Sequence, residues 1–146
     1  MGERMSAELA RLLRERKLLR IRADRKLVSK EMEAASYDLT RARRSLDDDD
    51  AKWAIVKAYY AMFHAARALL FSKGFREKSH RALLAALREL FRGSIEPEHF
   101  DAFEDGMAMR EEADYSMVYS EESASELVEN AQRFLLEAKR MLKIED

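Results

Sequence analysis

The scarcity of turn-forming residues is the strongest constraint on how this chain folds. Its 146 residues include four glycines and one proline, and a sheet of many strands needs more such residues in its turns. Hydrophobic residues make up 47% of the chain, which is enough for one core. Charged residues reach 38%, against a usual share of about a quarter. We therefore expect one all-α domain, a helical bundle, over residues 1–146.

Hydrophobic periodicity and end signals predict six helices. Asp24, Ser79 and either Ser120 or Ser123 are suitable N-caps, and Asp50, the last of four consecutive aspartates, is suited to cap the helix that follows. The expected ranges are 6–20, 25–46, 51–73, 79–92, 97–116 and 121–143. Residues 1–24 are expected to form a basic N-terminal helix and connector, and residues 25–143 the core bundle.

The segment 51–73 is apolar nearly all round, which predicts the central helix of the bundle. His64 and Arg67 nevertheless lie in one arc of it, beside Tyr60. An unpaired buried charge is costly, so Arg67 needs an acceptor or a cleft. Two interpretations follow: neighbouring carboxylates or carbonyls satisfy both side chains inside the core, or both side chains form the wall of a ligand-binding groove.

The fifth predicted helix raises the same question. Arg110 and Asp114 fall inside its apolar arc, four residues apart, where they can form an ion pair. The pair is either a structural bridge or an arginine presented to a phosphate, with Asp114 fixing its direction. A basic cluster at the start of the fourth helix has the composition of an anion-binding rim or of ordinary surface, and it contains Arg76, Lys78, His80 and Arg81.

Charge is unevenly distributed along the chain. Residues 1–44 carry 13 Lys or Arg and 7 Asp or Glu, whereas residues 101–146 carry 5 and 13. The basic third can meet phosphates or an anionic surface, or pair with the acidic C-terminal helix of its own chain or of a partner subunit. The formal net charge of −1 favours compensation between the two ends.

Several chemistries have no support in the sequence. The chain has no cysteine, and His64, His80 and His99 lie on separate segments without metal-ligand spacing. It has no glycine-rich phosphate loop, no apolar signal core and no membrane-length apolar stretch. We expect a cytoplasmic protein with no metal, no cofactor and no membrane association.

Four segments in register resemble the HEPN domain family over about residues 25–143. The central one is AYYAMFHAARALL at residues 58–70, followed by Gly74 and by Lys-Ser-His at residues 78–80. Arg110-x-x-Ala113-Asp114-Tyr115 comes next in the order and spacing of that family. Ala34-x-x-Tyr37-Asp38-Leu39-x-x-Ala42 and Ala131-x-x-Phe134 complete the resemblance, which is to the small stand-alone prokaryotic branch.

The resemblance implies an up-and-down bundle of four long helices plus short extra ones, usually a homodimer that associates near the arginine motif. Many members are metal-independent endoribonucleases, often toxins of toxin–antitoxin pairs, and others accompany a nucleotidyltransferase partner. Nucleotide or RNA binding is their broad theme. We therefore expect a module that binds a nucleotide, RNA or a nucleotidyltransferase partner.

Enzymatic activity stays open, because active members carry Arg, four to six residues and then His. Arg110 is present, but Tyr115, Ser116 and Met117 occupy the three places for that histidine. The alternatives are a metal-independent endoribonuclease with a relocated acid or base, which leaves a 2′,3′-cyclic phosphate, and a purely structural dimer. The candidate catalytic residues are Arg110, Tyr115 and His64, and the expected ligand-binding residues are Arg110, Asp114, Tyr115, His64, Arg67, Lys78, His80 and Arg81.

Overall fold

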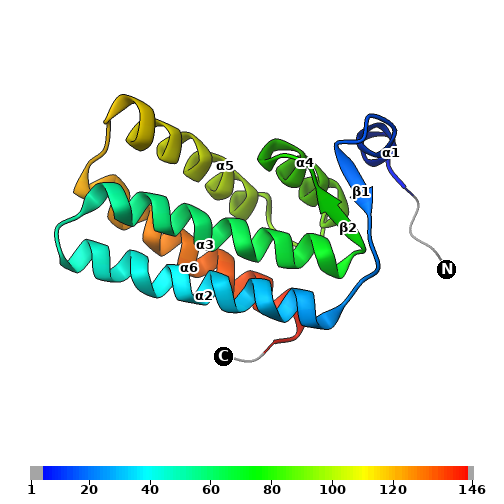
Figure 1. The fold of residues 1–146 in the computed structure, drawn as a ribbon, viewed down its shortest axis with the longest axis horizontal. Coiled ribbons are helices and arrows are strands. Elements are labelled where there is room, and N and C mark those ends of the chain that lie inside the picture. The colour runs from blue at the N-terminus through cyan, green and yellow to red at the C-terminus, as the bar shows by residue number, and fades with distance from the viewer. Residues whose placement is uncertain (1–4, 145–146) are drawn as a thin grey trace.

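The computed structural model describes residues 5–144 as a helical bundle with one two-stranded sheet (Figure 1). The helices are α1 (Ala7–Arg14), α2 (Arg25–Asp47), α3 (Ala51–Ser72), α4 (His80–Leu90), α5 (Pro97–Glu111) and α6 (Glu121–Leu142). A π-helical turn, η1 (Glu112–Ser116), follows α5 directly. The strands β1 (Leu18–Arg20) and β2 (Phe75–Glu77) pair in antiparallel fashion, with Leu19 opposite Arg76. The predicted all-α class is confirmed.

The centre of the bundle is α3, as its apolar sequence predicts. It contacts α2, α6, α5 and α4, and Figure 1 shows α2, α3 and α6 as long, nearly aligned rods with α5 beside them. Tyr59 and Met62 of α3 are fully buried. A partly exposed stripe remains at the helical spacing of three and four residues, formed by Trp53, Lys57, Tyr60, His64 and Arg67.

Side-chain caps fix where the helices begin. The side chain of Asp24 accepts a hydrogen bond from the Lys26 N–H at the start of α2, and Asp50 accepts one from the Trp53 N–H at the start of α3. Ser79 and Ser120 cap α4 and α6 in the same way, so Ser120 rather than Ser123 takes that role. Pro97 occupies the first turn of α5, as predicted.

The predicted helix over residues 6–20 is wrong in its second half. The helix α1 ends at Arg14, Arg16 takes a positive φ of 59°, and residues 18–20 form β1. Leu18 is buried where β1 pairs with β2. Helix-forming residues thus yield to pairing with a strand almost sixty positions later, an interaction that local propensity cannot anticipate.

The two oppositely charged ends of the chain meet between α2 and α6. Arg43 Nη1 lies 3.1 Å from Glu129 Oε1, and Arg43 also donates to Gln132. The basic helix α1 contacts α4 and β1. Compensation within the chain therefore holds for Arg43, whereas α1 packs at a different place from the acidic helix.

Gly106 lets α5 approach α3 closely. A Cβ atom at this position would lie 2.8 Å from Cε of Met62 and 3.6 Å from Cδ1 of Tyr59. Arg110 follows four residues later on the same face of α5, so the close approach brings Arg110 over the tyrosines of α3. None of the helices within residues 5–144 combines the length and apolar character needed to cross a membrane.

Candidate functional site on the central helix

Arg110 lies against the aromatic side chains of α3. Its Cζ is 5.5 Å from the ring centroid of Tyr59 and 5.8 Å from that of Tyr60, which are cation–π contacts. One terminal nitrogen lies 3.4 Å from Oδ2 of Asp114, so the predicted ion pair forms, at a long distance. The Nε atom of Arg110 is buried and has no hydrogen-bond partner within residues 5–144. Arg110 therefore keeps hydrogen-bonding capacity that the protein does not use.

The turn after Arg110 departs from regular helix. Asp114 lies in the π-helical turn η1, which ends at Met117 with a positive φ of 58°. Turns of this kind are rare and occur often at functional sites. Asp114 contacts Arg110 from within this wider turn.

His80 stands at the first turn of α4, beside the same tyrosine. Its Nδ1 is 2.5 Å from the Tyr59 hydroxyl oxygen, and its ring centroid is 4.4 Å from that of Phe63. Its Nε2 makes no hydrogen bond in the described part of the chain. Burial, then the positive charges of Arg110 and Arg67, lower the pKa of His80, so the imidazole is largely neutral near pH 7. Burial also raises the pKa of Tyr59, which keeps its hydroxyl protonated.

His64 and Arg67 belong to a different cluster, centred on Glu31 of α2. His64 Nδ1 lies 2.6 Å from Glu31 Oε2, and Arg67 Nη1 lies 3.1 Å from Glu31 Oε1. Arg67 Nε is 2.9 Å from an oxygen of Glu77 on β2, an ion pair without hydrogen-bond geometry. Asp38 adds a second carboxylate 3.6 Å from His64 Nε2.

The charges of the Glu31 cluster stabilise one another. Burial acts to raise the pKa of Glu31, but the hydrogen bond from His64 and the charge of Arg67 outweigh it, so the pKa is lowered. Glu31 is therefore ionised at neutral pH. This agrees with the interpretation in which carboxylates satisfy His64 and Arg67, and the structure shows no contact between either side chain and Arg110.

The remaining predicted site residues are more exposed. Arg81 lies 3.9 Å from Glu104 and is mostly exposed. The Lys78 side chain is also exposed, while its backbone N–H donates to the carbonyl of Lys17. The Tyr115 side chain is 79% exposed and makes no contact with Arg110 within the described residues. Tyr59 contacts both Arg110 and His80, and Asp114 contacts Arg110, so these residues form one group. The predicted site residues outside that group are Tyr115, His64, Arg67, Lys78 and Arg81.

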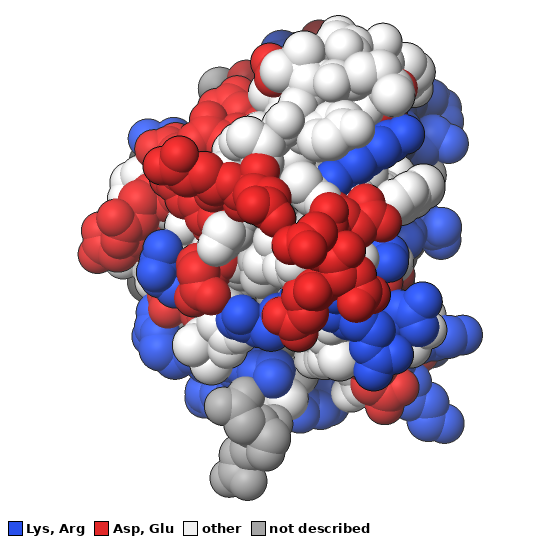
Figure 2. All heavy atoms as spheres, turned by 90° about the vertical axis from the view of Figure 1, so that its left-hand side faces the viewer, with Lys and Arg blue, Asp and Glu red and all other residues white. Residues whose placement is uncertain are grey.

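Tyr115 is instead part of an exposed uncharged patch at the end of the bundle. Figure 2 shows acidic side chains gathered across the middle of this end and uncharged surface above them, at the level of η1. The exposed large residues of the patch are Tyr115, Met117, Val118 and Tyr119. The exposed acidic residues of this end are Asp47, Asp48, Asp49, Asp50, Glu111, Glu112, Glu121 and Glu122.

Three members of these clusters were not predicted from the sequence: Tyr59, Glu31 and Glu77. Tyr59 resembles any buried aromatic residue of a core helix. Glu77 comes into contact through a strand that the sequence does not predict. Glu31 did leave a signal, since Glu31 and Asp38 stand seven residues apart on the face of α2 that also holds the buried Ala35.

The described residues contain no group of side chains placed to bind a metal ion. Between residues 5 and 144 no three His, Cys, Asp or Glu side chains are grouped so that they could hold a metal ion. The site itself holds the half-buried guanidinium of Arg110, the imidazole of His80, the buried hydroxyl of Tyr59 and the partly exposed carboxylate of Asp114. Such groups bind phosphate oxygens and transfer protons.

Comparison with known proteins gives the family. A protein of Methanocaldococcus jannaschii named "Putative toxin MJ0605" is 30% identical over 115 residues, which are 77% of this chain and 86% of the relative. A second from the same organism, "Putative toxin MJ0142", is 26% identical over 130 residues, 86% of this chain and 88% of the relative. A UPF0332 protein of Archaeoglobus fulgidus is 34% identical over 86 residues, 56% of this chain and 68% of the relative. The HEPN domain family model matches residues 28–141, and the chain therefore belongs to the HEPN domain family.

Proposed function

We propose that this chain is a toxin-like HEPN module that binds RNA, with Arg110 as the contact to a backbone phosphate. The observation that carries the proposal is the unpaired Nε of Arg110, beside a long contact to Asp114. A half-buried guanidinium with unused donors is suited to phosphate oxygens. The two relatives whose names contain the word toxin match this chain over 86% and 88% of their own lengths, which agrees with such a role.

Each neighbour of Arg110 has a part in this proposal. The faces of Tyr59 and Tyr60 support the guanidinium without using its donors. Asp114 orients it from the adjoining turn. His80, held by Tyr59, is the polar group nearest to this arrangement from α4, and His64 and Arg67 serve the fold through Glu31.

A second candidate function is metal-independent cleavage of the bound RNA, and His80 is the observation that favours it. In this reaction the ribose 2′-oxygen attacks the adjacent phosphorus and the bond from phosphorus to the 5′-oxygen breaks. The 2′-hydroxyl proton passes to a base and the leaving 5′-oxygen takes up a proton, which gives a 2′,3′-cyclic phosphate and a 5′-hydroxyl. A largely neutral imidazole near Arg110 is suited to accept the first proton.

Partner binding is the remaining part of the proposal. The uncharged patch of Tyr115, Met117, Val118 and Tyr119 lies a few residues after Arg110. We assign self-association, or docking of a partner antitoxin such as a nucleotidyltransferase, to this face. Sedimentation of the wild type and of a Tyr115→Ser, Val118→Ser variant tests it. If this face serves self-association, the variant should form a smaller particle, and an unchanged assembly contradicts self-association through this face.

Incubation of end-labelled RNA with the full chain in EDTA tests both functions. We expect Arg110→Gln to weaken RNA binding by about tenfold, the cost of about one charge-assisted contact. The matched control is Arg88→Gln, because Arg88 is a partly buried arginine already paired with Asp101 and Glu104. Equal losses in both variants would contradict the proposal and leave Arg110 as a structural bridge.

The same samples decide the question of cleavage. Product with a 2′,3′-cyclic end, formed by the wild type and lost in His80→Gln with RNA binding retained, supports the ribonuclease. Binding without product removes this second candidate and leaves the binding module. Product that persists in His80→Gln would place proton transfer on another group.

A further inference from the structure

A hollow with a basic lining lies toward the C-terminal end of α3, away from Arg110. Its volume is about 830 Å³, and its walls come from the connector before α2, the first turns of α2, the end of α3 and β2. Arg67 and Phe71 of α3 line it, and their side chains are in cation–π contact. Tyr60 and Arg67 are seven residues apart, about 10 Å along the helix axis, so this hollow is separate from the Arg110 site.

Three cations around the hollow make no ion pair within residues 5–144. Arg22 of the connector, Lys30 of α2 and Arg76 of β2 are exposed and line it. None of the three makes an ion pair or hydrogen bond with a side chain in the part of the chain that the structure describes, although the charge of Arg76 acts on Glu31 and Glu77. The connector with the first turns of α2, and the distant strand β2, thus bring positive charge to one place, beside the partly buried charge of Arg67.

The two carboxylates in the lining offset only part of this charge. Asp24 is exposed and accepts the Lys26 N–H at 2.8 Å as the cap of α2. Glu31 is held by His64 and Arg67. Five arginine and lysine side chains against two carboxylates leave the lining with a net charge of +3.

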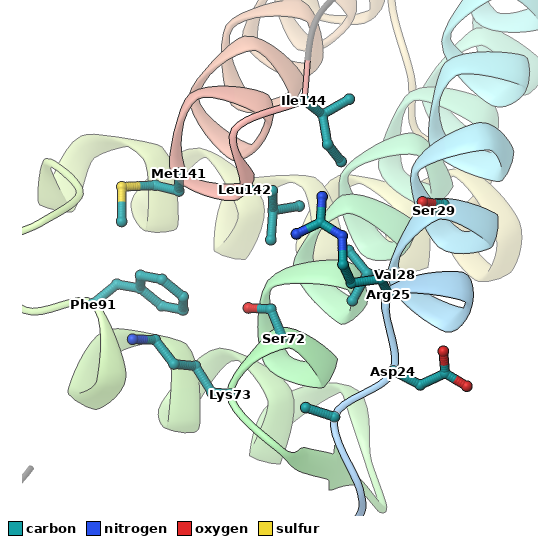
Figure 3. A pocket seen from close by; sticks show the side chains of 11 residues that line it. Asp24, Arg25, Val28, Ser29, Ser72, Lys73, Phe91, Met141, Leu142 and Ile144 are labelled. Atoms are coloured by element: carbon teal, nitrogen blue, oxygen red, sulfur yellow. The ribbon is translucent and has the colours of Figure 1, made fainter. Parts of the chain in front are cut away.

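Arg25 lines the basic hollow too, but it also lines a neighbouring hollow and is left out of this set for that reason. The neighbouring space has a volume of about 300 Å³, and its apolar lining residues are Ala23, Val28, Phe91, Met141, Leu142 and Ile144. Figure 3 shows the Arg25 side chain extending toward Leu142 and Ile144. The contrast between the two spaces is chemical, since one is largely apolar and the other is ringed by unpaired cations.

We propose that the basic hollow binds a compact anion with two or more linked phosphates, the chemistry shared by nucleoside triphosphates and inorganic tripolyphosphate. Arginine and lysine are the side chains that bind phosphate oxygens, and the volume lies in the usual range for small-molecule sites. The cations converge on one hollow rather than lying along a line. This arrangement suits a compact ligand with linked phosphates better than an extended nucleic-acid strand. This ligand site is independent of the RNA contact proposed for Arg110.

Calorimetric titration of the full chain with tripolyphosphate, ATP and adenosine in EDTA tests the proposal. The test variant is Arg22→Gln, Arg76→Gln, and its matched control is Arg14→Gln, Arg44→Gln, which removes two exposed arginines elsewhere. We expect the test variant to bind tripolyphosphate at least about tenfold more weakly and the control to change affinity by less than about twofold. Thermal unfolding of both variants checks that they fold.

The ligands and one further variant separate the outcomes. Equal affinities for tripolyphosphate and ATP mean that the phosphates alone are recognised, and tighter ATP binding means that the nucleoside adds contacts; either supports the site. Binding of adenosine but not of tripolyphosphate, no binding of tripolyphosphate at about 1 mM, or equal losses in the test and control variants would overturn it. Arg110→Gln should keep its tripolyphosphate affinity even where its RNA binding is lost, so failure of one proposal is distinguishable from failure of the other.

Discussion

Two arginines on this bundle are equally buried and differ in what surrounds them. The side chain of Arg67 is 18% exposed and that of Arg110 is 19% exposed. Arg67 contacts two carboxylates, at 3.1 Å and 2.9 Å, one of which also holds His64. Neither Nε makes a hydrogen bond, but that of Arg67 lies beside Glu77, whereas Arg110 has one distant carboxylate, two aromatic faces and no carboxylate beside its Nε. Burial alone therefore does not separate a structural arginine from a ligand-binding one; the partners do.

The histidines beside them differ in the same sense. His64 is bound by a carboxylate, with its Nδ1 2.6 Å from Glu31. His80 is bound by a tyrosine hydroxyl, close to a positive guanidinium, and its pKa is lowered. In the Glu31 cluster the charged groups are paired with one another. In the Arg110 site a guanidinium is left to bind an anion, and an imidazole is left to accept a proton.

The largest effect on stability is expected where the charges are satisfied. Glu31→Gln removes the charge that both His64 and Arg67 contact, and leaves Arg67 with Glu77 alone. We expect a loss of about 2 kcal/mol in the free energy of unfolding, less than for a fully buried pair because these side chains are partly exposed. Urea denaturation measures it, with Glu33→Gln on the exposed face of α2 as the control.

The loss of stability caused by Glu31→Gln should also change with pH in a direction that can be measured. Because the pKa of Glu31 is lowered in the folded chain, its contribution is complete above the unfolded pKa of about 4.5. The contribution is then lost as the pH falls through the folded pKa. The difference between wild type and Glu31→Gln should therefore shrink in acid, and a difference that grows there would contradict the assignment.

A smaller loss is expected for the tyrosine that holds His80. Tyr59→Phe removes the buried hydroxyl and leaves Nδ1 of His80 without its partner. We expect a cost of about 1 kcal/mol, the usual value for one hydrogen bond. Tyr60→Phe is the neighbouring control, because the Tyr60 hydroxyl makes no hydrogen bond within residues 5–144, and it should be near neutral. Equal costs would refute the role given to Tyr59.

The titration of His80 tests the Arg110 site without a ligand. Its pKa should lie below the ordinary value of about 6.5, because burial and then the charge of Arg110 lower it. Its stability contribution is then complete above the unfolded pKa and is lost as the pH falls through the folded pKa. NMR of the imidazole should show this pKa rise in Arg110→Gln, and a pKa that stays unchanged would separate His80 from Arg110.

The smallest effect on stability is expected at Tyr115. Its side chain is 79% exposed, so Tyr115→Ser should change the free energy of unfolding by less than about 0.5 kcal/mol. Thermal unfolding in dilute solution measures it. A large loss would mean that Tyr115 packs in the fold, contrary to its exposed position.

The sequence was sufficient for helices α2 to α6, but not for the end of α1 and only for part of the site. Capping residues and periodicity placed α2 to α6 within a few residues of their observed ends. The Arg110–Asp114 pair followed from spacing along one helix. The pairing of β1 with β2, and hence Glu77 beside Arg67, needed contacts between distant segments. Tyr59 joins His80 to the Arg110 site only because α4 begins beside α3, which periodicity does not reveal.

The most direct test of the account is to observe the arginine side chains while RNA binds. In an NMR titration with a short single-stranded RNA in EDTA, the Nε–H signals are assigned with Arg110→Gln and Arg88→Gln. If Arg110 binds a backbone phosphate, its signal should shift as RNA saturates the protein, because its Nε is unpaired in the free chain, while the signal of Arg88, whose Nη2 is paired with Asp101 and Glu104, should stay in place. RNA binding with the Arg110 signal unmoved would contradict the central claim.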